Sequence, residues 1–66
     1  MEIFLNGRLK AATPQETILK ILEDHRLNPQ AVAVEVNGLV IERGKFGMTR
    51  LSQDDHVEIL HFVGGG

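Results

Sequence analysis

The sequence predicts an α+β domain in which a mixed sheet of about five strands packs on one helix. Two Asn-Gly dipeptides, at positions 6–7 and 37–38, each lie between runs rich in apolar residues. Apolar residues at helical spacing separate these two regions, and a final apolar run precedes the last glycines. We therefore expect the order β-β-α-β-β-β in a single domain that spans residues 1–66.

The first two strands form a predicted β-hairpin. Residues 3–5 are apolar, Asn6-Gly7 follows, and residues 8–12 alternate between polar and apolar with a period of two. An Asn-Gly pair between two such runs favours a type I′ turn, because both central positions of that turn need positive φ.

The helix has two candidate start points. Thr13 with Pro14 and Glu16 matches a capping box, whereas Thr17 is placed to cap a helix that begins at Ile18. Only one of the two threonines can be the N-cap, and the sequence leaves the choice open.

The helix has one apolar face and a clear stop signal. Four residues recur at the spacing i, i+3, i+4 and i+7 and form one face, namely Ile18, Ile21, Leu22 and His25. Asn28-Pro29 is expected to terminate the helix, since the residue before a proline is disfavoured in the helical region. The result is a helix of about two to three turns, packed on the sheet.

The second half of the chain repeats the first hairpin and adds a last strand. Valines alternate over residues 32–36, Asn37-Gly38 follows, and residues 39–42 form the next strand. Residues 43–53 are expected to be a connecting loop with one short turn, anchored by Phe46 or Leu51. The last strand is expected to begin near His56.

Composition excludes several classes of function. The chain has no cysteine, which excludes disulfides, thiolate metal ligands and a cysteine nucleophile. Its net charge of -2 gives no electrostatic footprint for nucleic acid. The N-terminus lacks a signal-like segment and no stretch reaches transmembrane length, so we expect a cytoplasmic protein without a membrane partner.

A metal site is not expected. His56 and His61 lie five residues apart on one predicted strand, so their side chains point to opposite faces of the sheet. His25 lies near the end of the predicted helix, where the helix dipole favours a cation and a structural role suffices. Arg43, Lys45 and Arg50 are the main basic grouping, best interpreted as a solvated loop.

The last three residues are the main functional signal. Gly64, Gly65 and Gly66 follow an apolar run, and without Cβ atoms they can pass through channels that exclude any side chain. We expect a flexible tail over residues 64–66 that carries a terminal carboxylate at most about 10 Å into another protein. The alternative is a frayed end without function, since termini are commonly disordered unless tied down.

A helix across one face of such a sheet, with the first and last strands paired within it, is the β-grasp or ubiquitin-like arrangement. From end to end the chain resembles the ThiS family of sulfur carrier proteins of thiamin biosynthesis. One departure is Asp54-Asp55, where the family usually has Gly-Asp, so Asp54 is expected to adopt the left-handed conformation. The resemblance is carried by Ile3-Phe4-Leu5-Asn6-Gly7, Thr17, Ile21-Leu22, residues 32–38, Arg43, and Leu51 through Ile59 to the terminal glycines.

The resemblance implies a carrier rather than an enzyme, with no bound cofactor. A ThiF-like adenylyltransferase would use ATP and Mg²⁺ to convert the carboxylate of Gly66 to an acyl-adenylate. A persulfide on a donor protein would then displace AMP and leave a thiocarboxylate, which thiazole synthase would consume. In this scheme Gly64 and Gly65 thread the tail into each active site, and positioning supplies much of the rate.

The partner-binding surface is expected on the last strand. Alternation places one set of side chains on one face, namely Val57, Ile59 and His61, and the other set on the opposite face, namely Glu58, Leu60 and Phe62. If the first set faces the helix, Leu60, Phe62 and the adjoining Val63 remain for partners, since exposed apolar side chains mark such sites. The alternative is that Phe62 folds over the sheet edge as core. Resemblance alone adds Arg43 as a partner contact.

Three other functions stay open at this stage. The small subunit of molybdopterin synthase would share the fold and the thiocarboxylate chemistry, although that family is usually longer and often has prolines before its glycines. A β-grasp interaction module would make the glycines incidental. A protein tag would join its terminus to lysines of other proteins.

Overall fold

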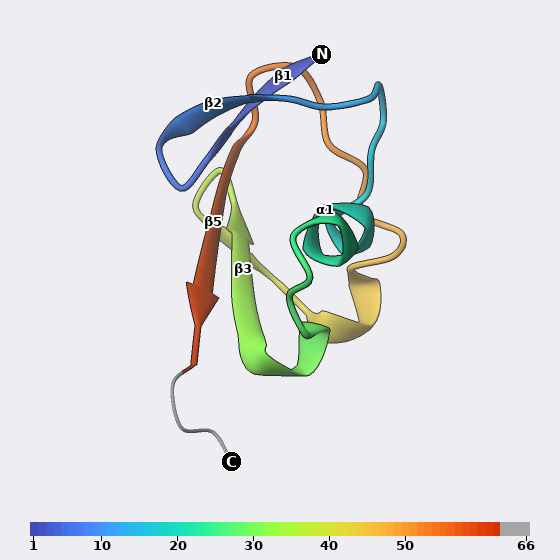
Figure 1. Ribbon diagram of the computed structural model, residues 1–66, viewed down its shortest axis with the longest axis vertical. Coiled ribbons are helices and arrows are strands. Elements are labelled where there is room, and N and C mark those ends of the chain that lie inside the picture. The colour runs from blue at the N-terminus through green and yellow to red at the C-terminus, as the bar shows by residue number, and fades with distance from the viewer. Residues whose placement is uncertain (63–66) are drawn as a thin grey trace.

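The computed structural model describes residues 1–62, and this part of the chain contains five strands, one α-helix and two short 3-10 helices (Figure 1). The predicted α+β order is confirmed. The strands are β1 (Glu2–Leu5), β2 (Arg8–Ala11), β3 (Val32–Val36), β4 (Leu39–Ile41) and β5 (His56–His61); the helices are α1 (Ile18–Asp24), η1 (Pro29–Ala31) and η2 (Arg43–Lys45).

The sheet has the strand order β2-β1-β5-β3-β4, so the last strand lies in its centre. Strand β5 runs parallel to β1 and antiparallel to β3 (Figure 1). The two hairpins, β1–β2 and β3–β4, are antiparallel and flank β5 on its two sides. The mixed sheet of the β-grasp arrangement is therefore present, with β5 held between the first and third strands.

Both Asn-Gly dipeptides adopt the predicted turn. Asn6 and Gly7 have φ values of 49° and 82°, and Asn37 and Gly38 have values of 52° and 84°. Positive φ at both central positions is the signature of the type I′ turn, whose twist matches that of the two flanking strands.

The two asparagines also fasten β5, a role the sequence did not reveal. The backbone N–H of Asn6 donates to the carbonyl of Val57 at 2.8 Å, and its Oδ1 accepts from the N–H of Ile59 at 2.7 Å. The N–H of Asn37 donates to the carbonyl of His56 at 2.7 Å, and its Oδ1 accepts from the N–H of the same residue at 2.9 Å. Each asparagine side chain thus adds a hydrogen bond to β5 just after its own strand, β1 or β3, has ended.

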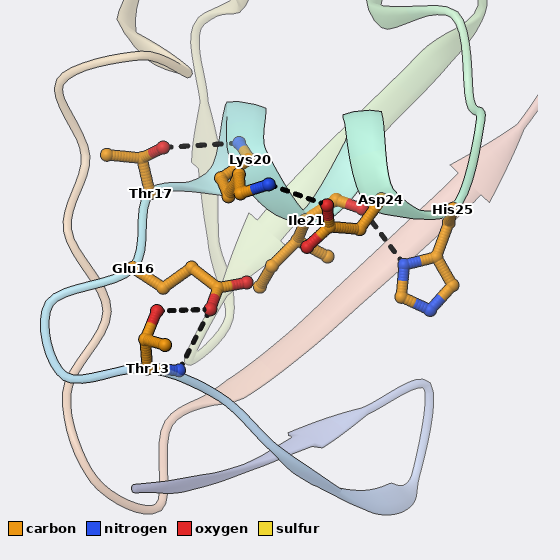
Figure 2. Close-up of polar contacts among 7 residues, drawn as sticks. All are labelled: Thr13, Glu16, Thr17, Lys20, Ile21, Asp24 and His25. Carbon is orange, nitrogen blue, oxygen red and sulfur yellow. Dashed lines mark hydrogen bonds and ion pairs between the residues drawn. The ribbon is translucent and has the colours of Figure 1, made fainter.

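Thr17 is the N-cap of α1, which settles the choice between the two threonines. Its Oγ1 accepts from the backbone N–H of Lys20 at 3.1 Å (Figure 2). Thr13 instead donates to the Glu16 carboxylate, from its N–H at 2.9 Å and its hydroxyl at 2.6 Å. The capping-box pattern therefore closes the turn before the helix, not the helix itself.

The expectation that Asn28-Pro29 terminates α1 is wrong. The helix has seven residues, about two turns, and ends at Asp24. Arg26 has a φ of 56°, its N–H donates to the carbonyl of Glu23 at 3.0 Å, and the N–H of Leu27 donates to that of Leu22 at 2.8 Å. This is a Schellman motif, and it ends the chain's helical path before the proline is reached.

The core lies between α1 and one face of the sheet, which we call the covered face (Figure 1). Phe46 and Leu51 are both buried, so both anchor the loop after β4. His25 is exposed and caps the C-terminus of α1, with its Nδ1 2.9 Å from the carbonyl oxygen of Ile21. The buried residues are Ile3, Ile18, Ile21, Leu22, Val32, Val34, Phe46, Leu51 and Val57.

Candidate functional site

The candidate site is the C-terminal end of β5, where the central strand leaves the sheet. His61 pairs with Val32, and the N–H of Phe62 donates to the carbonyl of Ala31 at 2.9 Å. The backbone is therefore paired with β3 up to His61, and the last described residue, Phe62, is held by Ala31 just before β3. Four predicted site residues, Val63, Gly64, Gly65 and Gly66, lie outside the described residues.

The side chains of β5 alternate between the two faces as predicted. Val57 is 1% exposed in the core, whereas Leu60 is 56% and Phe62 51% exposed. The alternative in which Phe62 folds over the edge as core is therefore wrong. Both apolar side chains lie on the face opposite to α1, which we call the open face.

The strand register places two rows of residues side by side on the open face. Leu60 lies opposite Ala33, and Glu58 lies opposite Glu35 in the next row. Together with Phe62 these residues form what we call the open-face patch. It combines exposed apolar surface near the end of β5 with two carboxylates one row further from the C-terminus. The sequence alone did not reveal the glutamate pair, because the pairing of β3 with β5 is long-range.

An aromatic pair, Phe4 and His56, lies on the open face at the N-terminal end of β5. The rings of Phe4 and His56 stack with centroids 4.5 Å apart and planes inclined by 17°. Leu9 lies opposite Phe4 on β2 and is exposed. His56 lies on the open face at one end of β5, whereas His61, which pairs with the buried Val32, lies on the covered face at the other end. Residues 1–62 contain no group of three or more His, Cys, Asp or Glu residues that could hold a metal ion.

Arg43 has a structural position. Its Nε donates to the carbonyl of Pro29 at 2.8 Å, and its Nη2 donates to that of Val32 at 3.2 Å. The guanidinium therefore fastens the segment after β4 to the start of β3. A contact between Arg43 and a partner stays a prediction.

Titratable groups with shifted pKa values cluster at α1, on the other side of the sheet (Figure 2). The hydrogen bond from Thr13 lowers the pKa of the Glu16 carboxyl. The ion pair of Lys20 with Asp24, at 2.8 Å between Nζ and Oδ1, raises the pKa of the lysine and lowers that of the aspartate. These groups serve the helix and its preceding turn.

The α1 helix is far shorter than a membrane span, and no other helix of residues 1–62 has the length and apolar character to cross a bilayer.

Comparison with known proteins gives a consistent result. The family model described as ThiS family matches residues 3–66. The chain is 36% identical over 63 residues to the sulfur carrier protein ThiS of Bacillus subtilis, covering 94% of this chain and 96% of that protein. It is 41% identical over 66 residues to a thiazole synthase of Magnetococcus marinus, covering 100% of this chain but only 20% of that relative.

Two solved structures are also similar. A crystal structure of the thiamine biosynthesis protein ThiS from Geobacter metallireducens matches with a TM-score of 0.83 and 32% identity, covering 100% of both chains. A solution structure of a thiamine biosynthesis protein from the same organism matches with a TM-score of 0.77 and 33% identity, covering 100% of this chain and 88% of the other.

Proposed function

This chain belongs to the ThiS family, and from that premise we propose that the carboxylate of Gly66 is the group on which it carries sulfur. The chain is a sulfur carrier of thiamin biosynthesis and not itself a catalyst. The observation that carries the proposal is the position of β5. A central strand, held up to Phe62, leads directly into the last four residues.

The geometry suits delivery of a chain end. Four residues beyond Phe62 can span at most about 14 Å. Fixing each of them costs roughly 1 to 2 kcal/mol in backbone entropy, so the tail needs a docking surface elsewhere to offset several kcal/mol. Gly64 and Gly65 pass through the narrow part of the partner's site, where a Cβ atom would clash.

The chemistry begins with activation, because a carboxylate is a poor electrophile. An adenylyltransferase directs the Gly66 carboxylate against the α-phosphate of Mg²⁺-bound ATP, which releases pyrophosphate and gives an acyl-adenylate. A persulfide sulfur of a donor protein then attacks the acyl carbon and expels AMP. Cleavage of the resulting sulfur–sulfur bond by a thiol leaves the thiocarboxylate on Gly66 and a disulfide on the donor.

Thiazole synthase is the proposed acceptor of this sulfur. A relative named thiazole synthase contains a segment similar to the whole of this chain, and the chain spans one fifth of that relative's length. The relatives and solved structures named for ThiS and thiamine biosynthesis likewise favour the thiazole pathway over molybdopterin synthase.

The docking surface is the open-face patch with the residues that adjoin it. Leu60 and Phe62 supply exposed apolar area, and Val63 follows Phe62 in the sequence, next to the terminal glycines. Apolar side chains exposed together on a small domain are typical of a partner site. Arg43 joins this surface only if its guanidinium exchanges a backbone carbonyl for a partner group.

Growth of a strain that lacks its own sulfur carrier tests the proposal. A variant without Gly65 and Gly66 should fold, since it keeps all nine buried core residues that the structure describes, yet it should not restore growth without thiamin. Gly44→Ala is the matched control: an added Cβ at Gly44 meets nothing within 4 Å, so this variant should restore growth fully. Equal growth with the shortened chain would contradict the proposal.

A further inference from the structure

Glu35 and Glu58 form an unusual pair at the centre of the sheet. Among the cross-strand pairs of residues 1–62 they are the only two charged residues directly opposite each other, and both are acidic. Like charges in this arrangement destabilise a sheet.

Nothing in the described part of the chain neutralises this pair. The two basic residues of the strands, Arg8 and Lys10, lie opposite Leu5 and Ile3, and Ile3 is a core residue, so both belong to the covered face. The ion pair formed within residues 1–62 joins Lys20 to Asp24 on α1. The open face of the strands therefore presents these carboxylates with no lysine or arginine of the strands on the same face and no ion pair to either of them within residues 1–62.

The next row of the sheet shows what kind of group fits here. Leu60 is exposed and lies opposite Ala33, whose small side chain leaves a step beside the leucine. A long side chain with an apolar stem and a cationic head can lay its stem along Leu60 above Ala33. Its head then reaches the row of Glu35 and Glu58.

We propose that the open-face patch binds an arginine side chain of thiazole synthase, whose guanidinium bridges the carboxylates of Glu35 and Glu58. This inference rests on the proposed function, because it names the chemistry by which the carrier recognises that partner. Arginine fits better than lysine because its planar fork donates to two carboxylates at once. Two like charges placed opposite each other lower stability, and such unfavourable arrangements are expected at functional sites, where a partner relieves them.

Charge removal with a matched control tests the inference. Binding of the full chain to thiazole synthase is measured by calorimetry at about 0.05 M and about 0.5 M salt, since exposed charge pairs weaken as the screening length falls. The variants are Glu35→Gln and Glu58→Gln. The control is Glu23→Gln, an exposed residue of α1 that loses the same charge on the covered side.

Each open-face variant should weaken binding about tenfold at low salt, which corresponds to about 1.4 kcal/mol. The same variants should bind with a flatter salt dependence and should resist urea as well as or better than the natural chain, because the repulsion is gone. Glu23→Gln should bind within about twofold of the natural chain. A loss of binding together with unchanged or higher stability is a result that damaged folding cannot produce.

The inference is overturned if Glu35→Gln and Glu58→Gln bind as the control does at both salt concentrations, or bind more tightly. A parallel experiment measures sulfur delivery to thiazole synthase by the thiocarboxylate form of the natural chain. It distinguishes a failure of the arginine site from a failure of the proposed function. If the natural chain delivers sulfur and neither variant changes binding to thiazole synthase, only the proposal of the arginine site is refuted. Failure of the natural chain to deliver sulfur removes the proposed function.

Discussion

The two faces of the sheet are built from the same strands, but one face forms the core and the other is exposed. On the covered face, alternate residues of β1, β3 and β5 join α1, Phe46 and Leu51 in a core of nine buried residues. On the open face, the intervening residues leave Leu60 exposed and set Glu58 against Glu35. Because side chains alternate with a period of two, one strand contributes some residues to the core and, in our proposal, others to partner recognition. Substitutions should therefore separate the two properties.

The largest effect should come from the covered face. Leu22 is completely buried on α1, and Leu22→Ala should lower the free energy of unfolding by about 3 kcal/mol, since it removes apolar contacts and leaves a cavity. Leu60→Ala makes the same chemical change on the open face and should cost less than about 1 kcal/mol. Urea unfolding monitored by circular dichroism compares them, and equal losses would erase the distinction between the faces.

Sulfur transfer should show the reverse order. Leu60→Ser should reduce the rate of thiocarboxylate formation about tenfold while changing stability by less than about 1 kcal/mol. Leu39→Ser is the control: Leu39 is 70% exposed but lies opposite Val36, away from the open face. Its rate should equal that of the natural chain. Undiminished transfer in Leu60→Ser would remove Leu60 from the docking surface.

The two Asn-Gly turns should respond differently to one substitution. Asn6 uses its Oδ1 to accept from Ile59, so Asn6→Asp keeps that bond. Asn37 also donates from Nδ2 to Oδ1 of Asp55 at 3.0 Å, so Asn37→Asp places two carboxylates in contact. At neutral pH, Asn37→Asp should therefore lower the free energy of unfolding by about 1 kcal/mol more than Asn6→Asp does.

Acidification provides the check on this cause. The difference in unfolding free energy between Asn37→Asp and Asn6→Asp should become smaller in acid. There a proton on one of the two carboxyl groups removes their repulsion. Urea unfolding at both pH values measures this difference. A difference that is the same at both values would mean that charge is not the cause.

A small gain in stability is expected at Asp54. Its φ of 67° lies in the left-handed region, which favours glycine, and its N–H is held by the carbonyl of Glu2 at 2.7 Å. Asp54→Gly should raise the unfolding free energy by about 0.5 kcal/mol, the relief of strain outweighing the entropy that glycine adds to the unfolded chain. Ser52→Gly, at a residue without positive φ, should lower it instead. Thermal unfolding of both variants gives the comparison.

Local signals in the sequence predicted much of this structure. Asn-Gly between apolar runs gave both hairpins, and alternation in residues 57–62 gave the two faces of β5. The resemblance also anticipated the conformation of Asp54. These features depend on neighbours within a few residues, which is the range over which turn and strand preferences act.

The remaining features depend on contacts that are distant in sequence or unusual in kind. Arg26 ends α1 in a left-handed conformation that arginine seldom adopts, so the proline downstream was a misleading signal. The opposition of Glu35 and Glu58 needs the pairing of β3 with β5 across more than twenty residues. The bonds from Asn6 and Asn37 to β5 likewise exist only once the sheet has assembled.

The most direct test of the central claim is the mass of the C-terminal peptide. The chain is incubated with its adenylyltransferase, Mg²⁺-ATP and a persulfide donor, then cleaved and analysed by mass spectrometry. The account predicts that one oxygen of Gly66 is replaced by sulfur and that every other peptide is unchanged. An unmodified Gly66 under conditions in which sulfur still reaches thiazole, or sulfur found on another residue, would contradict it.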